Sequence, residues 1–245
     1  MGKFQMKAIR PLLLLAALLV GGFVVSTDSS SLLAKKKGTV IGRQATTMAW
    51  TPEIMQIINA GDPQRGKALA KEHRCKKCHG KTGISDENDT PNIAGLPRAY
   101  AFKQMFDYKN RRRHDKSMRS RCQKITLENI ADLAAWFETQ KMEPMMGVAA
   151  SKTVPELVNK GDMSRLLLPC RTCHNKQGTG RGQLVPRIGG QKREHFVDMM
   201  MAYKEAERTN DDYGVMRFIA ERLSDDEIEQ LALYYGSRPI EEDDD

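Results

Sequence analysis

Two stretches of the chain place hydrophobic residues at helical spacing, i, i+3, i+4 and i+7. The first stretch contains Ile130, Leu133, Ala134 and Phe137, and the second contains Ile228, Leu231, Ala232 and Tyr235. This period predicts amphipathic helices. A capping residue precedes each stretch: Thr126 the first, and Ser224, with Glu227 at capping-box spacing, the second. No stretch alternates hydrophobic and polar residues convincingly, so we expect an all-α fold.

The hydrophobic pattern belongs to a longer internal repeat. Five identical pairs recur at an offset of 95 residues: Cys75 and Cys170, Ile93 and Ile188, Gly95 and Gly190, Met105 and Met200, Tyr108 and Tyr203. The second copy then gains three residues, and the offset of 98 relates Met118 to Met216. Repetition on this scale predicts two homologous domains. We place them at residues 53–145 and 150–240.

Each copy contains one C-x-x-C-H motif, at residues 75–79 and 170–174. This motif is the attachment signature of a c-type haem. Two residues between the thiols match the gap between neighbouring vinyl groups of the porphyrin, and the histidine that follows projects towards the iron. We therefore expect two haem c groups. The residues that attach them are Cys75, Cys78, Cys170 and Cys173, and the first axial ligands are His79 and His174.

The second axial ligand is predicted from matched position in the two copies. Met118 and Met216 follow the motif histidines by 39 and 42 residues, and each precedes a closing helix by the same interval. A thioether is a soft ligand, and His/Met ligation raises the reduction potential of haem iron. The alternative for each methionine is a place in the hydrophobic core.

The N-terminus has the pattern of an export signal. Lys3, Lys7 and Arg10 precede the uncharged residues 11–25, a run too short for an ordinary spanning helix. We expect residues 1–34 to be a cleaved signal peptide, with a retained membrane anchor as the alternative, and residues 35–52 to be a linker. Because haem is attached outside the cytoplasm in bacteria that use this motif, we expect a periplasmic protein. Residues 241–245 form an acidic tail.

The net charge of the chain indicates which kind of molecule it binds. The chain has a net charge of +8 and a pI of about 9.2 without any nucleic-acid-binding motif, so we expect acidic protein partners rather than nucleic acid. Basic residues cluster around Met118: Lys109, Arg111, Arg112, Arg113, Lys116, Arg119 and Arg121. This cluster is either a docking patch near the first haem or a solvated face.

The motifs together resemble the dihaem cytochromes of the c4 type, which consist of two class I cytochrome c domains. The resemblance covers about residues 58–238 and includes the segments Pro91 to Gly95 and Pro186 to Gly190. It implies that the carbonyl groups of Pro91 and Pro186 accept hydrogen bonds from the axial histidines. One departure is Asn175, which stands where the family usually has glycine and where the first copy has Gly80.

Two six-coordinate haems leave no open position for a substrate, so we expect an electron carrier and not an enzyme. Its partners would be redox proteins such as a terminal oxidase, a quinol-oxidising complex or a dehydrogenase. Two alternatives stay open. The chain could be the cytochrome subunit of a flavoprotein that oxidises sulfide. It could also be a dihaem sulfur-compound dehydrogenase in which Cys122, the one cysteine outside the motifs, binds the first haem iron.

Overall fold

The predicted helices begin at the residues expected to cap them. The computed structural model describes residues 48–142 and 153–236. Helix α6 (Leu127–Glu138) starts after Thr126, whose side chain accepts a hydrogen bond from the Asn129 amide. Helix α11 (Asp225–Tyr235) starts with the full capping box between Ser224 and Glu227. Local capping chemistry therefore sets where both closing helices begin.

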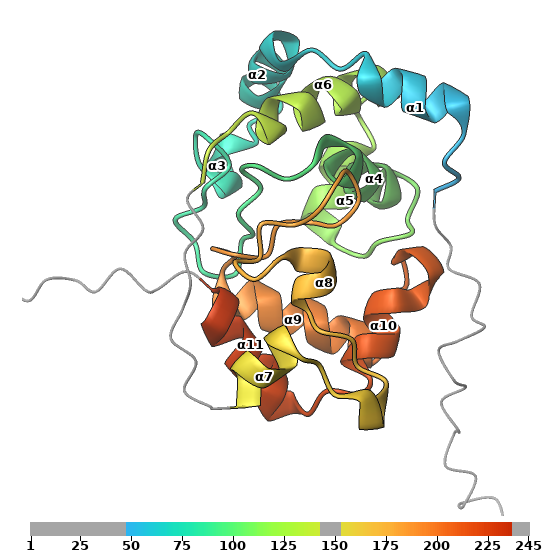
Figure 1. The fold of residues 1–245 in the computed structure, drawn as a ribbon. Helices are drawn as coiled ribbons and strands as arrows, with labels where there is room; N and C mark the ends of the chain where they lie inside the picture. The colour runs from blue at the N-terminus through green and yellow to red at the C-terminus, as the bar shows by residue number, and fades with distance from the viewer. Residues whose placement is uncertain (1–47, 143–152, 237–245) are drawn as a thin grey trace, which may run out of the picture. The chain divides into compact units, whose positions relative to one another are not determined.

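The fold is all-α in the described residues, which contain isolated β-bridges but no strand. The other elements, shown in Figure 1, are α1 (Pro52–Asn59), α2 (Pro63–Glu72), α3 (Lys76–His79), α4 (Arg98–Lys109), α5 (Lys116–Cys122), α7 (Thr153–Asn159), η1 (Met163–Arg165), α8 (Arg171–His174), α9 (Arg193–Lys204), η2 (Asp212–Gly214) and α10 (Val215–Ala220). Helices α3 and α8, and helices α4 and α9, have the same lengths and lie 95 residues apart. The sequence repeat is thus a repeat of structure.

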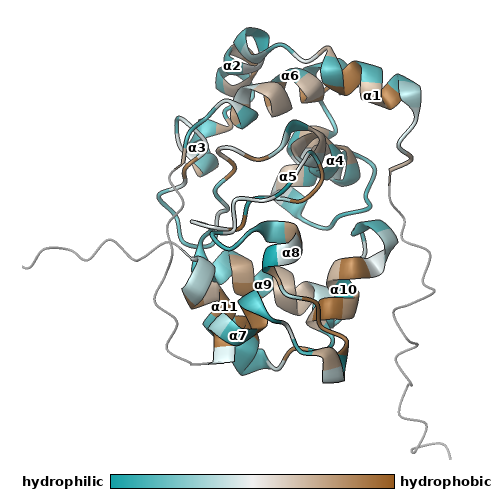
Figure 2. Ribbon diagram, viewed as in Figure 1, coloured by the Kyte–Doolittle hydropathy of each residue, from teal (hydrophilic) through white to brown (hydrophobic). Residues whose placement is uncertain are grey.

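Each copy has its own hydrophobic core. In the first half (residues 48–142), α6 packs against α2 and α4, and Phe102, Ile130 and Leu133 are almost fully buried. In the second half (residues 153–236), α9, α10 and α11 pack together around Ile228 and Tyr235. Figure 2 shows hydrophobic residues, in brown, on both α10 and α11. Burial of these apolar faces stabilises each half, by about 25 cal/mol per Å² of apolar surface removed from water.

The folded chain begins inside the segment expected to be a linker. Residues 48–50 lie within the predicted linker 35–52, yet Met48 is 2% exposed and belongs to the first core, against which Trp50 also packs. These apolar side chains thus contribute to a core whose other members lie further along the chain. The described residues all belong to one compact unit, residues 39–245. The predicted signal segment 1–34 and acidic tail 241–245 lie outside the described residues.

Polar contacts join the two halves next to the Pro-x-Ile-x-Gly segments. The Asn92 side chain donates to the Gly190 carbonyl at 2.8 Å, and the Gln191 side chain both donates to the Asn92 carbonyl and accepts from its amide, each at 2.9 Å. The Tyr100 amide also donates to the Gln183 carbonyl at 3.0 Å. Buried amide groups must be paired. These bonds therefore favour one arrangement of the two halves.

Gly80, directly after the first motif, lies where a side chain would be strained and would overlap its neighbour. Its φ is 71° and its ψ is 174°, and a Cβ there would lie 1.8 Å from the Ile84 carbonyl oxygen. Asn175 has nearly the same angles in the second half, φ 61° and ψ 166°, and its side chain donates to Thr179 at 2.9 Å and to the Gly180 carbonyl. The second loop accepts asparagine because those partners compensate for the strain.

We expect Gly80→Ala to destabilise the protein by about 2–4 kcal/mol, through the positive φ and the overlap with Ile84. Chemical denaturation of the haem-loaded protein measures the loss. Gly182→Ala is the matched control, because Gly182 also has a positive φ, 58°, but a Cβ there meets no atom within 4 Å. Equal losses in the two variants would show that the Ile84 contact contributes nothing.

Candidate functional site

Two one-turn helices present the motif cysteines and histidines. Cys75 and Cys170 are the residues that precede α3 and α8, and His79 and His174 are the last residues of these helices. In a helical turn, residues i and i+3 or i+4 lie on the same side. None of the four motif cysteines forms a disulfide. Both turns therefore present two thiols and one imidazole together.

A backbone carbonyl orients each motif histidine. His79 Nδ1 lies 2.9 Å from the Pro91 carbonyl oxygen, and His174 Nδ1 lies 3.1 Å from the Pro186 carbonyl oxygen. A carbonyl can only accept, so Nδ1 carries the proton in both rings. The other ring nitrogen, Nε2, then has a free lone pair. This is the tautomer that a metal-binding histidine requires.

Burial keeps both imidazoles neutral. It lowers the pKa of His79 and the pKa of His174 below the ordinary value, while the hydrogen bonds to Pro91 and Pro186 act in the opposite direction. A protonated imidazole cannot bind iron. Both histidines are therefore in the state that can bind iron at neutral pH.

Met118 lies on α5, close to the first motif. Its amide donates to the Asp115 side chain at 2.7 Å, which caps α5 and fixes the backbone position of the methionine. The charges of Arg121 and Asp115, which flank Met118 in the sequence, both influence the pKa of His79. Helix α5 is thus near the imidazole that the motif presents.

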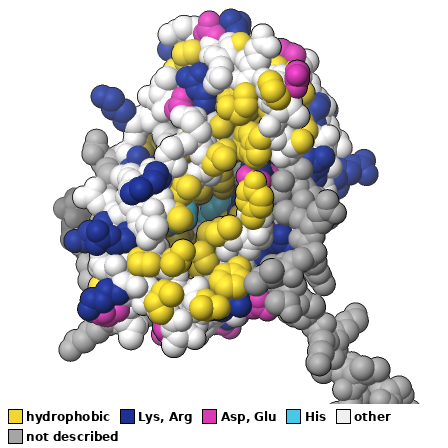
Figure 3. Space-filling view, turned by 45° about the vertical axis from the view of Figure 1, so that its right-hand side comes forward, with side chains coloured by type: hydrophobic (Ala, Val, Ile, Leu, Met, Phe, Trp, Pro, Cys, Tyr) yellow, Lys and Arg dark blue, Asp and Glu magenta, His cyan; other side chains and the backbone are white. Residues whose placement is uncertain are grey.

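Met216 occupies the corresponding position in the second half. It lies on α10, is half-buried, and packs with Cys170 against the second hydrophobic core. Figure 3 shows a face of the molecule on which hydrophobic side chains gather around a hollow, with a histidine side chain visible inside it. A hydrophobic surface around a histidine suits a large, flat apolar cofactor.

Two buried arginines at the contact between the halves were not predicted as site residues. Arg113 lies over the Tyr108 ring at 4.7 Å and is 9% exposed, while Arg208 lies over the Tyr203 ring at 4.5 Å and is 7% exposed. The two pairs are related by the 95-residue offset. Arg113 and Arg208 both donate to the Gln104 side chain, at 2.9 and 3.1 Å. The repeat therefore places two cations around one neutral acceptor.

Neither arginine has a carboxylate partner among the described residues. Their remaining hydrogen bonds reach neutral groups, namely Met199, Tyr100 and Asn210. Burial, together with the charges of Arg113 and Arg208, lowers the pKa of nearby His195 to about 3. Buried cations without anions are costly. Haem carries two propionate groups, so this cationic pair fits the cofactor that the motifs imply.

Arg113 therefore differs from the rest of the predicted basic cluster, which could be a docking patch or a solvated face. It is an interior residue, whereas Lys109, Arg111, Arg112, Lys116, Arg119 and Arg121 are at least partly exposed. Arg113 and Arg208 recur at the offset of 95 residues, and that match was a signal available in the sequence. Charge alone gave no way to separate an interior arginine from surface ones.

Cys122 is a buried thiol. It is 1% exposed, and burial raises its pKa to about 12. Its counterpart at the offset of 98, Ala220, is also fully buried. The site holds a small side chain in both halves, and the thiol stays protonated at neutral pH. Cys122 would therefore have to lose this proton inside an apolar site before its sulfur could bind iron as a thiolate.

The chain is similar to known cytochromes c in both sequence and structure. The cytochrome c family model matches residues 63–141. A curated cytochrome c4 from Thiocapsa roseopersicina is 36% identical over 184 residues, which cover 71% of this chain and 91% of that protein. The crystal structure of reduced recombinant cytochrome c4 from Pseudomonas stutzeri matches with a TM-score of 0.68 at 28% identity, covering 73% of this chain and 100% of that chain.

A second kind of relative is also found. The thiosulfate dehydrogenase electron acceptor of Thiomonas intermedia is 25% identical over 171 residues, which cover 68% of this chain and 79% of that protein. Its name describes a protein that accepts electrons from an enzyme.

Proposed function

The chain belongs to the cytochrome c4 family, and on that premise we propose that it carries single electrons through two His/Met-ligated haems in the periplasm. It is an electron-transfer cytochrome with two covalently attached haem c groups. The observation that supports the proposed ligation most directly is the hydrogen bond from each motif histidine to a proline carbonyl, at 2.9 and 3.1 Å. This bond occurs once in each half.

Residues of the same types would attach the haem and bind its iron in both halves. Cys75 and Cys78 would hold the first haem, and Cys170 and Cys173 the second. His79 and His174 would be the proximal ligands, kept in the right tautomer by Pro91 and Pro186. Met118 and Met216 would be the opposite ligands. When bound, haem supplies a one-electron couple between Fe(III) and Fe(II).

This ligand set favours a carrier over an enzyme. His79 with Met118, and His174 with Met216, would hold the two irons and would leave no position there for a substrate. The thioether favours the ferrous state, so both haems would have raised potentials. Arg113 and Arg208, buried where the halves meet, would hold haem propionates and link the electrostatics of the two sites.

The periplasm is the proposed location. Residues 1–34 would direct export, and residues 53–145 and 150–240 would each surround one haem. No helix within residues 48–142 and 153–236 is long and apolar enough to cross a membrane. If residues 1–34 are retained, they would tether the protein to the membrane.

Acidic redox proteins are the proposed partners. Lys109, Arg111, Arg112, Lys116, Arg119 and Arg121 lie at or near the surface around Met118. An acidic terminal oxidase, quinol-oxidising complex or dehydrogenase would be attracted to this cluster, and the attraction would weaken as salt is added. The rate of electron exchange would then fall with ionic strength.

A redox titration of the purified protein tests the proposal. A reduced-minus-oxidised spectrum should show two haems per chain, both low-spin. The weak near-infrared band of ferric iron bound to a thioether should account for both of them. A high-spin ferric haem, or a titration that requires one haem alone, would contradict the proposal.

A second candidate is a dedicated acceptor for a sulfur-compound dehydrogenase. The similarity to the thiosulfate dehydrogenase electron acceptor of Thiomonas intermedia favours it. The chain would remain a carrier, but its donor would be an enzyme that oxidises thiosulfate or, in the flavoprotein alternative, sulfide. Co-purification with a flavin-containing protein would identify the latter, and reduction by a thiosulfate dehydrogenase with thiosulfate would identify the former.

We expect Cys122→Ser to leave the haem spectra and both midpoint potentials unchanged, because the buried thiol is protonated and so would not bind iron as a thiolate. A loss of about 1–2 kcal/mol in stability is expected from placing a hydroxyl in an apolar site. Ala220→Ser, at the matching site of the second half, is the control for that cost. A changed first-haem spectrum in Cys122→Ser alone would restore the enzyme alternative.

A further inference from the structure

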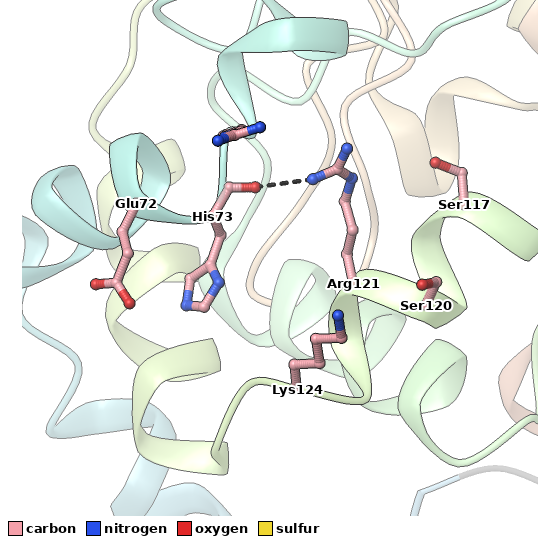
Figure 4. A pocket seen from close by; sticks show the side chains of 7 residues that line it. Glu72, His73, Ser117, Ser120, Arg121 and Lys124 are labelled. Carbon is pink, nitrogen blue, oxygen red and sulfur yellow. Dashed lines mark hydrogen bonds between the residues drawn. The ribbon is translucent and has the colours of Figure 1, made fainter.

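A polar pocket lies between the end of α2 and helix α5, beside the first motif. Its volume is about 390 Å³, and it is lined by Glu72, His73, Arg74, Ser117, Ser120, Arg121 and Lys124. Figure 4 shows that Glu72 and His73 come from one wall and Ser117, Ser120 and Arg121 from the other. The lining contains three permanent cations and one carboxylate. It therefore has an excess of two positive charges.

Most of the donors in this pocket have no partner. The Arg121 guanidinium donates one hydrogen bond, to the His73 carbonyl at 3.0 Å, which holds it across the pocket. In the described part of the chain, the side chains of Arg74 and Lys124 form no ion pair, and the hydroxyls of Ser117 and Ser120 form no hydrogen bond. The pocket thus combines free cationic donors with free hydroxyl donors.

The second half shows that the fold does not require this chemistry. The residues that correspond to the lining, at offsets of 95 and 98, are Leu167, Leu168, Pro169, Val215, Phe218, Ile219 and Arg222. Six of the seven are apolar. Leu168 and Val215 are 59% and 48% exposed, so an apolar surface is stable at this place. The cationic pocket is therefore a property of the first half alone.

We propose that this pocket binds a small divalent oxyanion of the sulfate or thiosulfate class. Two negative charges would balance the excess of two positive charges, and tetrahedral oxygen atoms can accept from guanidinium, ammonium and hydroxyl donors at the same time. Most of the lining side chains are exposed, so a small ion can reach their donors from solvent. Binding such an anion would be a second function of the protein, in addition to electron transfer.

A bound oxyanion would act on the first haem. Arg121 is held beside the first motif, because its guanidinium donates to the carbonyl of His73, two residues before Cys75. A positive charge near iron favours the ferrous state, and an anion that cancels it would favour the ferric state. By linkage, the ferric protein would bind the anion more tightly. A tenfold preference corresponds to a fall of about 59 mV in the midpoint potential of a one-electron couple.

Calorimetric titration of the oxidised, haem-loaded protein with sodium sulfate, at ionic strength held constant with sodium chloride, tests the binding. We expect one saturable site per chain. Lys124→Gln should weaken the affinity about tenfold, as loss of one charge-assisted hydrogen bond does. Ser117→Ala combined with Ser120→Ala should weaken it while leaving every charge in place. Arg222→Gln, at the matching position of the second half, should bind as the unaltered protein does.

The same samples give a second readout in a redox titration. Sulfate should lower the midpoint potential of one haem and leave the other unchanged, and Lys124→Gln should remove that shift. The inference is overturned if sulfate shows no saturable binding beyond chloride, if Lys124→Gln and Arg222→Gln behave alike, or if an acidic protein binds the cluster while sulfate does not. A normal two-haem spectrum in any of these cases would leave the electron-carrier proposal standing.

Discussion

Met118→His is expected to lower the midpoint potential of one haem by on the order of a hundred millivolts or more. Axial ligands set haem potentials over a range of about 0.8 V, and an imidazole favours the ferric state more than a thioether does. Met118 lies on α5, whose flanking charges at Asp115 and Arg121 influence His79. The variant should stay low-spin, because histidine still fills the sixth position. Half of the near-infrared thioether band should disappear.

Two further variants make this prediction specific. Met216→His should give the same changes in the other haem, because Met216 holds the matched place on α10. Met105→Leu is the control, since Met105 is half-buried against the first core and is not proposed as a ligand. It should keep both potentials and the full band. An undiminished band in Met118→His would show that this methionine does not bind iron.

Lys103→Met is expected to destabilise the protein by about 3–5 kcal/mol, the usual cost of leaving a buried charge without its partner. Lys103 and Asp107 form an ion pair at 2.7 Å, and their side chains are 4% and 0% exposed. The Lys103 ammonium also donates to the Asn210 carbonyl of the second half. Removing it therefore leaves Asp107 buried and deprives the contact between the halves of one bond. Denaturant unfolding of the haem-loaded protein measures the change.

The chain offers a matched control for this pair. Lys160 and Glu156 form an ion pair with the same i, i+4 spacing, at 2.9 Å, but their side chains are 73% and 61% exposed. Exposed pairs contribute little, so Lys160→Met should cost less than about 0.5 kcal/mol. Combining Lys103→Met with Asp107→Leu should recover part of the lost stability, because no unpaired charge remains. Similar losses in Lys103→Met and Lys160→Met would refute this explanation.

The buried ion pair between Lys103 and Asp107 occurs in only one of the two halves. Lys103 corresponds to Asp198 and Asp107 to Ala202 at the offset of 95 residues, so the second half lacks the buried pair. The pair therefore serves the contact between the halves rather than the cytochrome fold itself. By contrast, the stacked pairs Arg113 with Tyr108 and Arg208 with Tyr203 occur in both halves.

The sequence by itself determined the chemistry of the haem attachment and the order of the elements. The C-x-x-C-H motif spans five residues, so its geometry follows from one helical turn and needs no distant contact. The capping residues Thr126 and Ser224 act on amides three positions away, and each helix begins where they predict. The repeat made the two halves, and the matched methionines, visible without coordinates.

The tertiary structure alone decided which charges are inside. In the sequence, Arg113 is one member of a run of basic residues. In the structure it is buried, because Arg208 and Asn210 of the second half pack against α4 of the first half. The Lys103 ammonium and its Asn210 acceptor are 107 residues apart in the chain. Periodicity reports which face of a helix is apolar, but the partner of a polar side chain depends on which distant segment packs against it.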